Sequence, residues 1–187
     1  MYTPSYREDR IVAFDYDNTI TRDEIHTRHN RCKTDVDNTM GSLRRLEKIR
    51  QLFLGLNANN VRIIIVTFNQ EKHVRRMLHL FGLMRFVSGI YDHDFIFDFV
   101  SKVQIEICRE RKMRMAKQVF MVYYVGPKFL RNINTQTIML VDDQKSNLNG
   151  LSECCSTVHV DAIREGYGVN DREIALICRL FDIVYPL

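Results

Sequence analysis

Three short segments of this chain are almost continuously apolar, and each of them ends in a polar residue. They are Arg10–Asp15 (RIVAFD), Val61–Thr67 (VRIIIVT) and Thr137–Asp142 (TIMLVD). Runs of this kind are typical of strands that are buried on both faces, as in a parallel sheet. Two further strands are expected, at Ser156–Asp161 and, with a weaker pattern, at Arg85–Tyr91. These segments predict a sheet whose strands lie in the interior of the protein.

Helical patterns lie between the apolar runs. Met40–Leu56 and Gln70–Phe81 carry apolar residues at spacings of three and four, and Gly82 suits the end of the second helix. The sequence also predicts a long basic helix at Ser101–Gln118 and a C-terminal helix at Asp171–Phe181. Strands that alternate with helices favour right-handed crossovers and an open parallel sheet. We therefore predict a three-layer, Rossmann-like α/β fold with helices on both faces of the sheet.

A single domain is expected over residues 1–187, because the chain has the length of one domain and carries no linker, repeat or low-complexity tract. No apolar run approaches the roughly 18–20 residues of a membrane span, and the N-terminus lacks the apolar core of a signal peptide. The 5 cysteines are an odd, scattered set, which suits a reducing compartment better than a disulfide framework. These features predict an intracellular protein without a membrane partner. A net charge of +4 tolerates an anionic partner without indicating one.

Polar residues end three of the predicted strands. Asp15, Thr67 and Asp142 come from distant parts of the sequence, and each follows an apolar run. In open parallel sheets, ligands bind at the carboxyl ends of the strands. We therefore expect these three residues to meet at one edge of the sheet and to form a site there.

The pattern DxDNT occurs twice, at Asp15–Thr19 and at Asp35–Thr39. The first copy follows a buried strand and so lies at the predicted site. The second follows Arg28–Thr34, which is polar throughout, and precedes an amphipathic helix. One of the last three residues of the second copy is expected to be the N-cap of that helix. The chemistry is therefore expected at Asp15 and Asp17.

These motifs resemble those of a known family. FDYDNTIT (Phe14–Thr21), IIIVTFN (Ile63–Asn69) and IMLVDDQKSN (Ile138–Asn147) resemble the first, second and fourth motifs of the haloacid dehalogenase (HAD) superfamily of phosphohydrolases. The resemblance covers nearly the whole chain, from residue 10 to about residue 165. Its three motifs follow in the family's order, each at the end of a predicted strand.

The family's third motif is a lysine with little local pattern. Four lysines are candidates: Lys102, Lys112, Lys117 and Lys128. The segment that begins at Tyr124 (YVGPKFL) looks similar to the corresponding segment of the capless carboxy-terminal-domain-type phosphatases. On this resemblance Lys128 is favoured over the other three.

The resemblance implies phosphoryl transfer through an aspartyl-phosphate. Asp15 would attack phosphorus, and Asp17 would protonate the leaving oxygen and later deprotonate the attacking water. Thr67 and Lys128 would contact the phosphoryl oxygens, and Lys128 would also restrain Asp15. Asn69 is a further candidate for phosphate contact.

The resemblance also implies a metal. Four carboxylates and a phosphate ester would repel one another, and Mg²⁺ with its preference for oxygen ligands would compensate their charge. Its ligands would be the side chains of Asp15 and Asp142, the backbone carbonyl of Asp17, and Asp143 either directly or through water.

The gaps between the motifs leave little room for a separate cap domain. The chain thus resembles the capless, magnesium-dependent members of the family, although Asp92–Tyr124 could form a small helical lid. An open site favours a macromolecular substrate, either a phosphoprotein or a nucleic-acid end, over a small phosphomonoester. The basic stretch Arg109–Lys117 would be either a solvated helix face or a docking surface for such a polyanion. The alternative function is a HAD-fold binding or scaffold protein without turnover.

Two cysteine-containing stretches are expected to be inert. His26, His29 and Cys32 have a spacing that could hold zinc, but no fourth ligand is evident, and a solvated loop is the simpler interpretation. Cys154 and Cys155 precede a strand and are expected to be unreactive thiols.

Overall fold

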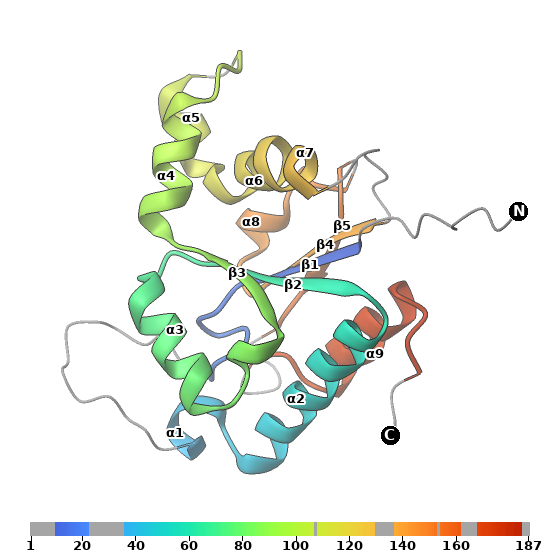
Figure 1. The fold of residues 1–187 in the computed structure, drawn as a ribbon. Helices are drawn as coiled ribbons and strands as arrows, with labels where there is room; N and C mark the ends of the chain where they lie inside the picture. The colour runs from blue at the N-terminus through green and yellow to red at the C-terminus, as the bar shows by residue number, and fades with distance from the viewer. Residues whose placement is uncertain are drawn as a thin grey trace, which may run out of the picture.

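A five-stranded, fully parallel sheet forms the centre of the protein (Figure 1). The computed structural model describes residues 10–22, 36–106, 108–129, 137–152, 154–161 and 168–184, with side chains except at positions 37, 38, 114 and 129. The strand order is β3-β2-β1-β4-β5. The strands are β1 (Arg10–Phe14), β2 (Val61–Val66), β3 (Val87–Tyr91), β4 (Ile138–Asp142) and β5 (Ser156–His159). All five predicted strands are confirmed.

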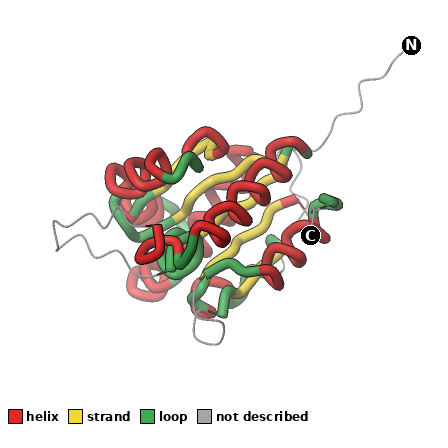
Figure 2. The backbone as a smooth tube through the Cα atoms, turned by 90° about the horizontal axis from the view of Figure 1, so that it is seen from below, coloured by secondary structure: helices red, strands yellow, loops and turns green. Residues whose placement is uncertain are grey.

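Two hydrophobic cores lie on opposite faces of this sheet. Val12 and Phe14 of β1 belong to one core, whereas Ile11 and Ala13 belong to the other, as the alternation of side chains along a strand requires. Helices α2, α3 and α9 cover the first face, and α4 to α8 lie on the second (Figures 1 and 2). The helices of the first face are α2 (Leu43–Ala58), α3 (Glu71–Leu80) and α9 (Asp171–Leu180). The predicted three-layer α/β architecture is confirmed.

The helix that follows the second DxDNT copy begins later than predicted. It is α2, whose N-cap is Ser42; the Ser42 hydroxyl accepts a hydrogen bond from the backbone N–H of Arg45 (3.1 Å). Residues 37–39 lie instead within a separate short helix, α1 (Val36–Met40), so the prediction that one of them caps the longer helix was wrong. Asp35 lies outside the described residues. The end predicted for α3 is confirmed, since Gly82 has the positive φ of +67° that glycine tolerates.

The predicted long basic helix at 101–118 was wrong, because the chain breaks there. Helix α4 starts earlier, where Asp92 accepts a hydrogen bond from the backbone N–H of Phe95 (3.0 Å). After the break, the Lys112 ammonium donates to the carbonyl of Val103 (2.9 Å) and so ties the turn together. The helical pieces are α4 (His93–Lys102), α5 (Arg109–Arg114), α6 (Ala116–Phe120), the π-helix η2 (Met121–Val125) and α7 (Gly126–Phe129). Helices α4 and α6 pack on the second face of the sheet and so belong to its helical layer.

The remaining elements are short. They are the 3₁₀-helix η1 (Met84–Phe86) and helix α8 (Lys145–Leu148). The four described cysteines are free thiols, and burial raises the pKa of Cys155 to about 12, in keeping with an unreactive side chain. His26, His29 and Cys32 lie outside the described residues. Within the described part of the chain, no helix has the length and apolar composition needed to cross a membrane.

Candidate functional site

The carboxyl ends of three central strands bring the predicted polar residues together. Asp15 directly follows β1, and its backbone N–H donates to the carbonyl of Val141 in β4 (2.9 Å). Thr67 follows β2 and donates in the same way to the carbonyl of Tyr91 at the end of β3 (3.0 Å). Asp142 is the last residue of β4. The expected convergence on one sheet edge is therefore present.

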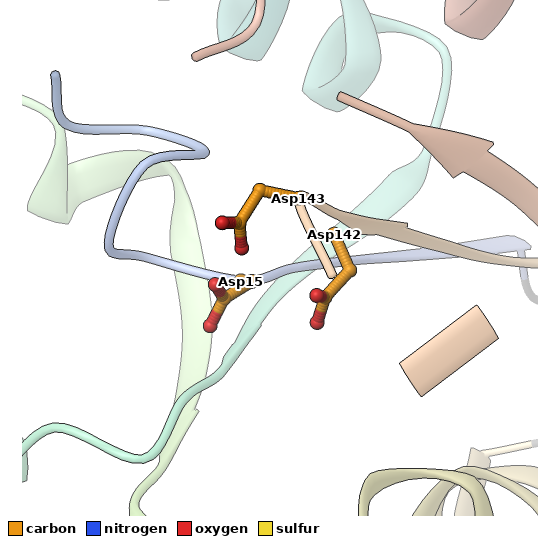
Figure 3. Close-up of side chains that lie close together, drawn as sticks. All are labelled: Asp15, Asp142 and Asp143. Atoms are coloured by element: carbon orange, nitrogen blue, oxygen red, sulfur yellow. The ribbon is translucent and has the colours of Figure 1, made fainter. Parts of the chain in front are cut away.

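Three carboxylates cluster at this edge (Figure 3). One oxygen each from Asp15, Asp142 and Asp143 lies within 4.8 Å of the others. Asp142 is fully buried, and Asp15 is only 6% exposed. Burial, with a further contribution from the Asp142 charge, raises the pKa of Asp15 to about 7 against the opposing effect of Lys117. Burial and Asp142 also raise the pKa of Asp143.

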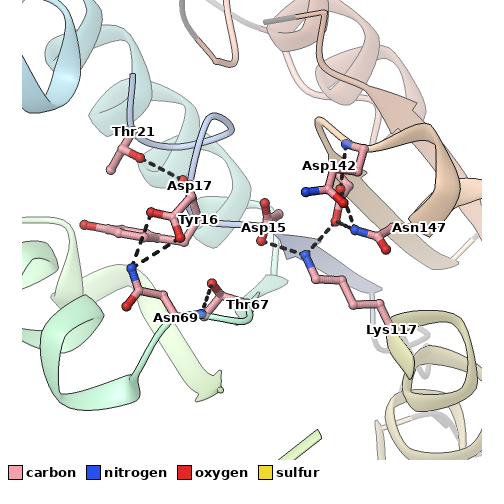
Figure 4. Close-up of polar contacts among 10 residues, drawn as sticks. Asp15, Tyr16, Asp17, Thr21, Thr67, Asn69, Lys117, Asp142 and Asn147 are labelled. Atoms are coloured by element: carbon pink, nitrogen blue, oxygen red, sulfur yellow. Dashed lines mark hydrogen bonds and ion pairs between the residues drawn. The ribbon is translucent and has the colours of Figure 1, made fainter. Parts of the chain in front are cut away.

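A buried ammonium group bridges two of these carboxylates (Figure 4). Lys117 on α6 places its Nζ 2.7 Å from Asp15 Oδ1 and 2.8 Å from Asp142 Oδ2. Burial alone would lower the pKa of Lys117, but the two carboxylates outweigh it, so this pKa lies above its ordinary value. Lys117 is therefore held as a cation in contact with the predicted nucleophile.

Lys128, which the sequence favoured for this position, lies elsewhere. Its Nζ on α7 contacts the hydroxyls of Tyr91 and Tyr124 and sits 4.6 Å from the centre of the Tyr124 ring. The contact with Asp15 that was predicted for Lys128 is made by Lys117. The sequence held a signal for this, since Lys117 falls at spacings of four and three from the apolar Met113 and Phe120. A lysine on the apolar stripe of a helix must find a buried partner.

The Asp142 carboxylate is oriented by further donors. The side-chain amide of Asn147 donates to its two oxygens (3.0 and 3.1 Å), and the backbone N–H of Gln144 donates to Oδ1 (2.8 Å). Asn147 is itself buried. With Lys117 on the other oxygen, Asp142 is held in one orientation.

The loop after β2 holds Asp17. The amide nitrogen of Asn69 donates to both carboxylate oxygens of Asp17 (3.2 and 3.4 Å), while Asn69 Oδ1 accepts from the backbone N–H of Gln70 (2.8 Å). The hydroxyl of Thr67 accepts from the backbone N–H of Asn69 (3.0 Å). Figure 4 shows that Asn69 and Thr67 lie on the same side of Asp15, with Lys117 on the other. Asn69, which the sequence named as a phosphate contact, contacts Asp17 here.

The backbone of the loop after β1 is held by one arginine that no local motif revealed. The guanidinium of Arg45 on α2 donates to the carbonyls of Thr19 (3.0 Å) and Ile20 (2.8 Å). It also donates to the carbonyls of Met40 (2.9 Å) and Val169 (3.3 Å). Burial lowers the pKa of Arg45 to about 10, so it remains charged near neutral pH. Arg45 thereby fixes the loop that carries Asp15 and Asp17.

Gly168 leaves the space that this arginine occupies. An added Cβ would collide with the Arg45 guanidinium and the carbonyl of Thr19, and the backbone has a φ of +63°. We expect Gly168→Ala to lower the free energy of unfolding by about 2–4 kcal/mol through strain and overpacking. Denaturation by urea measures this loss.

Gly150→Ala is the matched control for this prediction. Gly150 has a similar φ of +78° but nothing within 4 Å of the added carbon. It should cost only the conformational penalty of about 1–2 kcal/mol. Equal losses in the two variants would show that the packing around Arg45 is loose.

The residues at this edge suit a divalent cation. Three clustered carboxylates face the single ammonium of Lys117, so the cluster has more acidic groups than the described cation beside it can compensate. All the carboxylate donors are hard oxygens, which Mg²⁺ prefers over softer ligands. Asp15, Asp142 and Asp143 are therefore a fitting ligand set for it.

Comparison with known proteins gives structural neighbours only. No protein-family model matches the chain, and no curated protein matches it in sequence. An uncharacterised protein from Corynebacterium glutamicum has a TM-score of 0.54 at 16% identity, with 96% of this chain and 99% of that chain covered. The HAD domain of effector protein Lem4 from Legionella pneumophila has a TM-score of 0.53 at 15% identity, covering 93% and 96% of the two chains.

A third structural neighbour matches over the same shares of the two chains as the Lem4 domain. It is the core domain of a candidate phosphoglycolate phosphatase from Streptococcus pneumoniae, with a TM-score of 0.50 at 10% identity and 93% and 96% of the two chains covered. At such identities a likeness establishes the fold and not the activity. The chain has the fold of HAD domains, with a parallel sheet between two helical layers.

Proposed function

We propose that this protein is a Mg²⁺-dependent phosphomonoester hydrolase that works through a phosphorylated Asp15. The observation that carries the proposal is the position of Asp15. It lies at the end of β1, next to Asp142 and Asp143, and is bonded to the buried ammonium of Lys117. A nucleophilic carboxylate needs neighbours that offset its charge and that of the phosphate; Lys117 supplies one positive charge, and the clustered carboxylates would bind Mg²⁺ for the rest.

The reaction would take two displacements. An oxygen of Asp15 attacks phosphorus, the bond from phosphorus to the leaving oxygen breaks, and Asp17 gives its proton to that oxygen. Water then attacks the phosphorus of the aspartyl-phosphate, Asp17 takes the water proton, and inorganic phosphate leaves as the Asp15 carboxylate is restored. The hydrogen bonds from Asn69 hold Asp17 for both proton transfers.

Two side chains would stabilise the charge of the phosphoryl group. The Lys117 ammonium lies against the attacking carboxylate and so next to the incoming oxygens. Thr67, whose hydroxyl already accepts the Asn69 N–H, has its own proton available for a phosphoryl oxygen. The family's third-motif role thus goes to Lys117 rather than Lys128.

Mg²⁺ would be held by Asp15, Asp142 and Asp143, with the backbone carbonyl of Asp17 as the further ligand that the family resemblance implies. When bound, it supplies charge compensation for the carboxylates and the phosphate ester. Asn147 and the Gln144 N–H would keep Asp142 oriented toward it.

An open site and a macromolecular substrate belong to the same proposal. Between Thr67 and Lys117, α3 and α4 pack on opposite faces of the sheet and Met113 of α5 packs against the second core, which supports a site without a large cap. Phosphate groups on a protein or at a nucleic-acid end could reach such a site. The alternative is a binding or scaffold protein without turnover. The assay below distinguishes it from a phosphatase.

The test is hydrolysis of p-nitrophenyl phosphate by the purified protein. We expect turnover that requires Mg²⁺, disappears with a chelator and returns when Mg²⁺ is restored. A phosphopeptide and a 5′-phosphorylated oligonucleotide extend the assay to macromolecular substrates. A folded protein that hydrolyses none of the three with Mg²⁺ present would contradict the proposal and support the scaffold alternative.

A further inference from the structure

Three aromatic rings lie beside the phosphate site and take no part in the chemistry above. Phe68 stands between Thr67 and Asn69 in the loop after β2, and His93 and Phe97 lie on the first turns of α4. The His93 and Phe97 rings are stacked at 4.4 Å between centres, and Phe68 lies 5.6 Å from Phe97 and 6.2 Å from His93. We call these three rings the aromatic platform.

The platform adjoins the nucleophile through Lys117. The Lys117 Nζ sits 4.9 Å from the centre of the Phe68 ring and also hydrogen-bonds Asp15. Phe68 and the carboxylate that would attack phosphorus therefore contact the same ammonium group. The platform therefore borders the place at which the phosphate would react.

The platform is both exposed and fixed in place. Phe68 is 41% exposed, although it is a large apolar side chain, and the His93 side chain is 52% exposed. Asp92, the N-cap of α4, connects the first turn of α4 to the start of α3, just after the Phe68 loop, because its carboxylate accepts the backbone N–H groups of Glu71 (3.1 Å) and Phe95 (3.0 Å). Exposed aromatic rings held at a site edge are a surface on which another planar ring stacks.

We propose that the platform selects aryl phosphates, such as phosphotyrosine in a peptide, as substrates of this site. In an aryl phosphate the ring is joined to phosphorus through a single oxygen, so it must lie at the mouth of the site, where Phe68 is. In a nucleotide the sugar separates the base from the phosphate, which puts the base further from Lys117. This inference rests on the proposed phosphatase activity.

The experiment compares two peptides of one sequence that carry phosphotyrosine or phosphoserine at the same position. A phenol leaves more readily than an alcohol, so the preference of the native protein alone is not diagnostic. The informative quantity is the effect of Phe68→Leu on kcat/KM for each peptide. We expect about a tenfold loss with phosphotyrosine and less than about a threefold loss with phosphoserine, because leucine keeps apolar area but loses the ring face.

Phe95→Leu is the matched control. Phe95 is also on α4 and 43% exposed, but its ring contacts Tyr91, Phe120 and Tyr124 instead of the platform. It should leave the ratio of the two kcat/KM values unchanged. Any effect of Phe68→Leu on Lys117 itself would lower both activities alike and would not change the ratio.

The outcomes distinguish a failure of the platform proposal from a failure of the phosphatase proposal. Equal losses with both peptides, or no loss with either, would overturn the platform while leaving the phosphatase in place. A loss as large with a 5′-phosphorylated oligonucleotide as with phosphotyrosine would also overturn it, since the rings would then be serving a base. No hydrolysis of any substrate by the native protein would refute the phosphatase itself, and with it the platform.

Discussion

Lys117→Met is expected to lower kcat by about 10²–10³-fold. The change removes the cation that lies 2.7 Å from Asp15 and 2.8 Å from Asp142, in a site where both carboxylates are buried. The loss of one preorganised charge at a site of phosphoryl transfer is of this size. Steady-state kinetics on p-nitrophenyl phosphate at saturating Mg²⁺ measures it.

The same variant should be less stable without metal. Breaking a buried charge pair costs about 3–5 kcal/mol, although protonation of Asp15 would relieve part of that cost. Circular dichroism and urea denaturation must therefore accompany the kinetics. Activity that stays low in a protein shown to be folded assigns the loss to the site.

Lys128→Met is the matched control for this prediction, because both lysines were candidates for the lysine of the third motif. Lys128 contacts Tyr91 and Tyr124 on the second face, so its removal should change kcat by less than about twofold. The opposite pattern, with Lys128→Met inactive and Lys117→Met active, would contradict the assignment of Lys117. It would restore the assignment favoured by the sequence resemblance.

Asp15→Asn is expected to abolish turnover, with a loss of at least about 10³-fold, because an amide oxygen does not form the covalent intermediate. The fold should persist, since Asn keeps the shape of the side chain. Rapid-quench or mass-spectrometric detection should find a phosphorylated protein with native Asp15 and none with the variant. Residual hydrolysis at a tenth of the native rate would rule out Asp15 as the nucleophile.

The same substitution should stabilise the metal-free protein at high pH. The folded-state pKa of Asp15 is raised to about 7 from an ordinary 3.8, chiefly by burial. The unfolded chain therefore releases this proton at lower pH than the folded one, and the native protein loses stability as the pH rises from about 4 to 7. The variant carries no such proton. The difference between its free energy of unfolding in urea and that of the native protein should therefore grow over this pH range and level off above it.

At pH 8, saturating Mg²⁺ should make the native protein more stable than the Asp15→Asn variant. The cation binds the ionised native site and stabilises only the folded form, whereas the variant lacks one of its ligands. A native protein whose stability does not respond to Mg²⁺ would show that the acidic cluster does not hold the metal.

The fold followed from the sequence because each interior strand needs an unbroken apolar run. Such runs at 61–66 and 138–142 leave few alternatives, and the polar residues after them must then share an edge. The carboxylate cluster could therefore be predicted from the hydrophobic pattern alone. Local polarity could not place the helices as well, and the long helix predicted at 101–118 is several short ones.

The contacts of the residues that support the site could not be predicted from the hydrophobic pattern. Lys117 reaches Asp15 only because α6 packs on the second face of the sheet, 102 positions away in sequence. Arg45 contacts backbone carbonyls and the Phe68 ring lies against the Lys117 ammonium, and no motif encodes either contact. Their partners are set by tertiary packing, so the types of residue at the site could be predicted but not the residues that contact them.

We propose that Asp15 accepts the phosphoryl group beside a Mg²⁺ ion held by Asp142. The most direct test is a crystal structure of the native protein with Mg²⁺ and beryllium fluoride, a mimic of the bound phosphoryl group. We expect beryllium bonded to a carboxylate oxygen of Asp15, Lys117 next to the fluorines, and Mg²⁺ coordinated by Asp15 and Asp142. Beryllium bound elsewhere, or Mg²⁺ away from these two side chains, would contradict it.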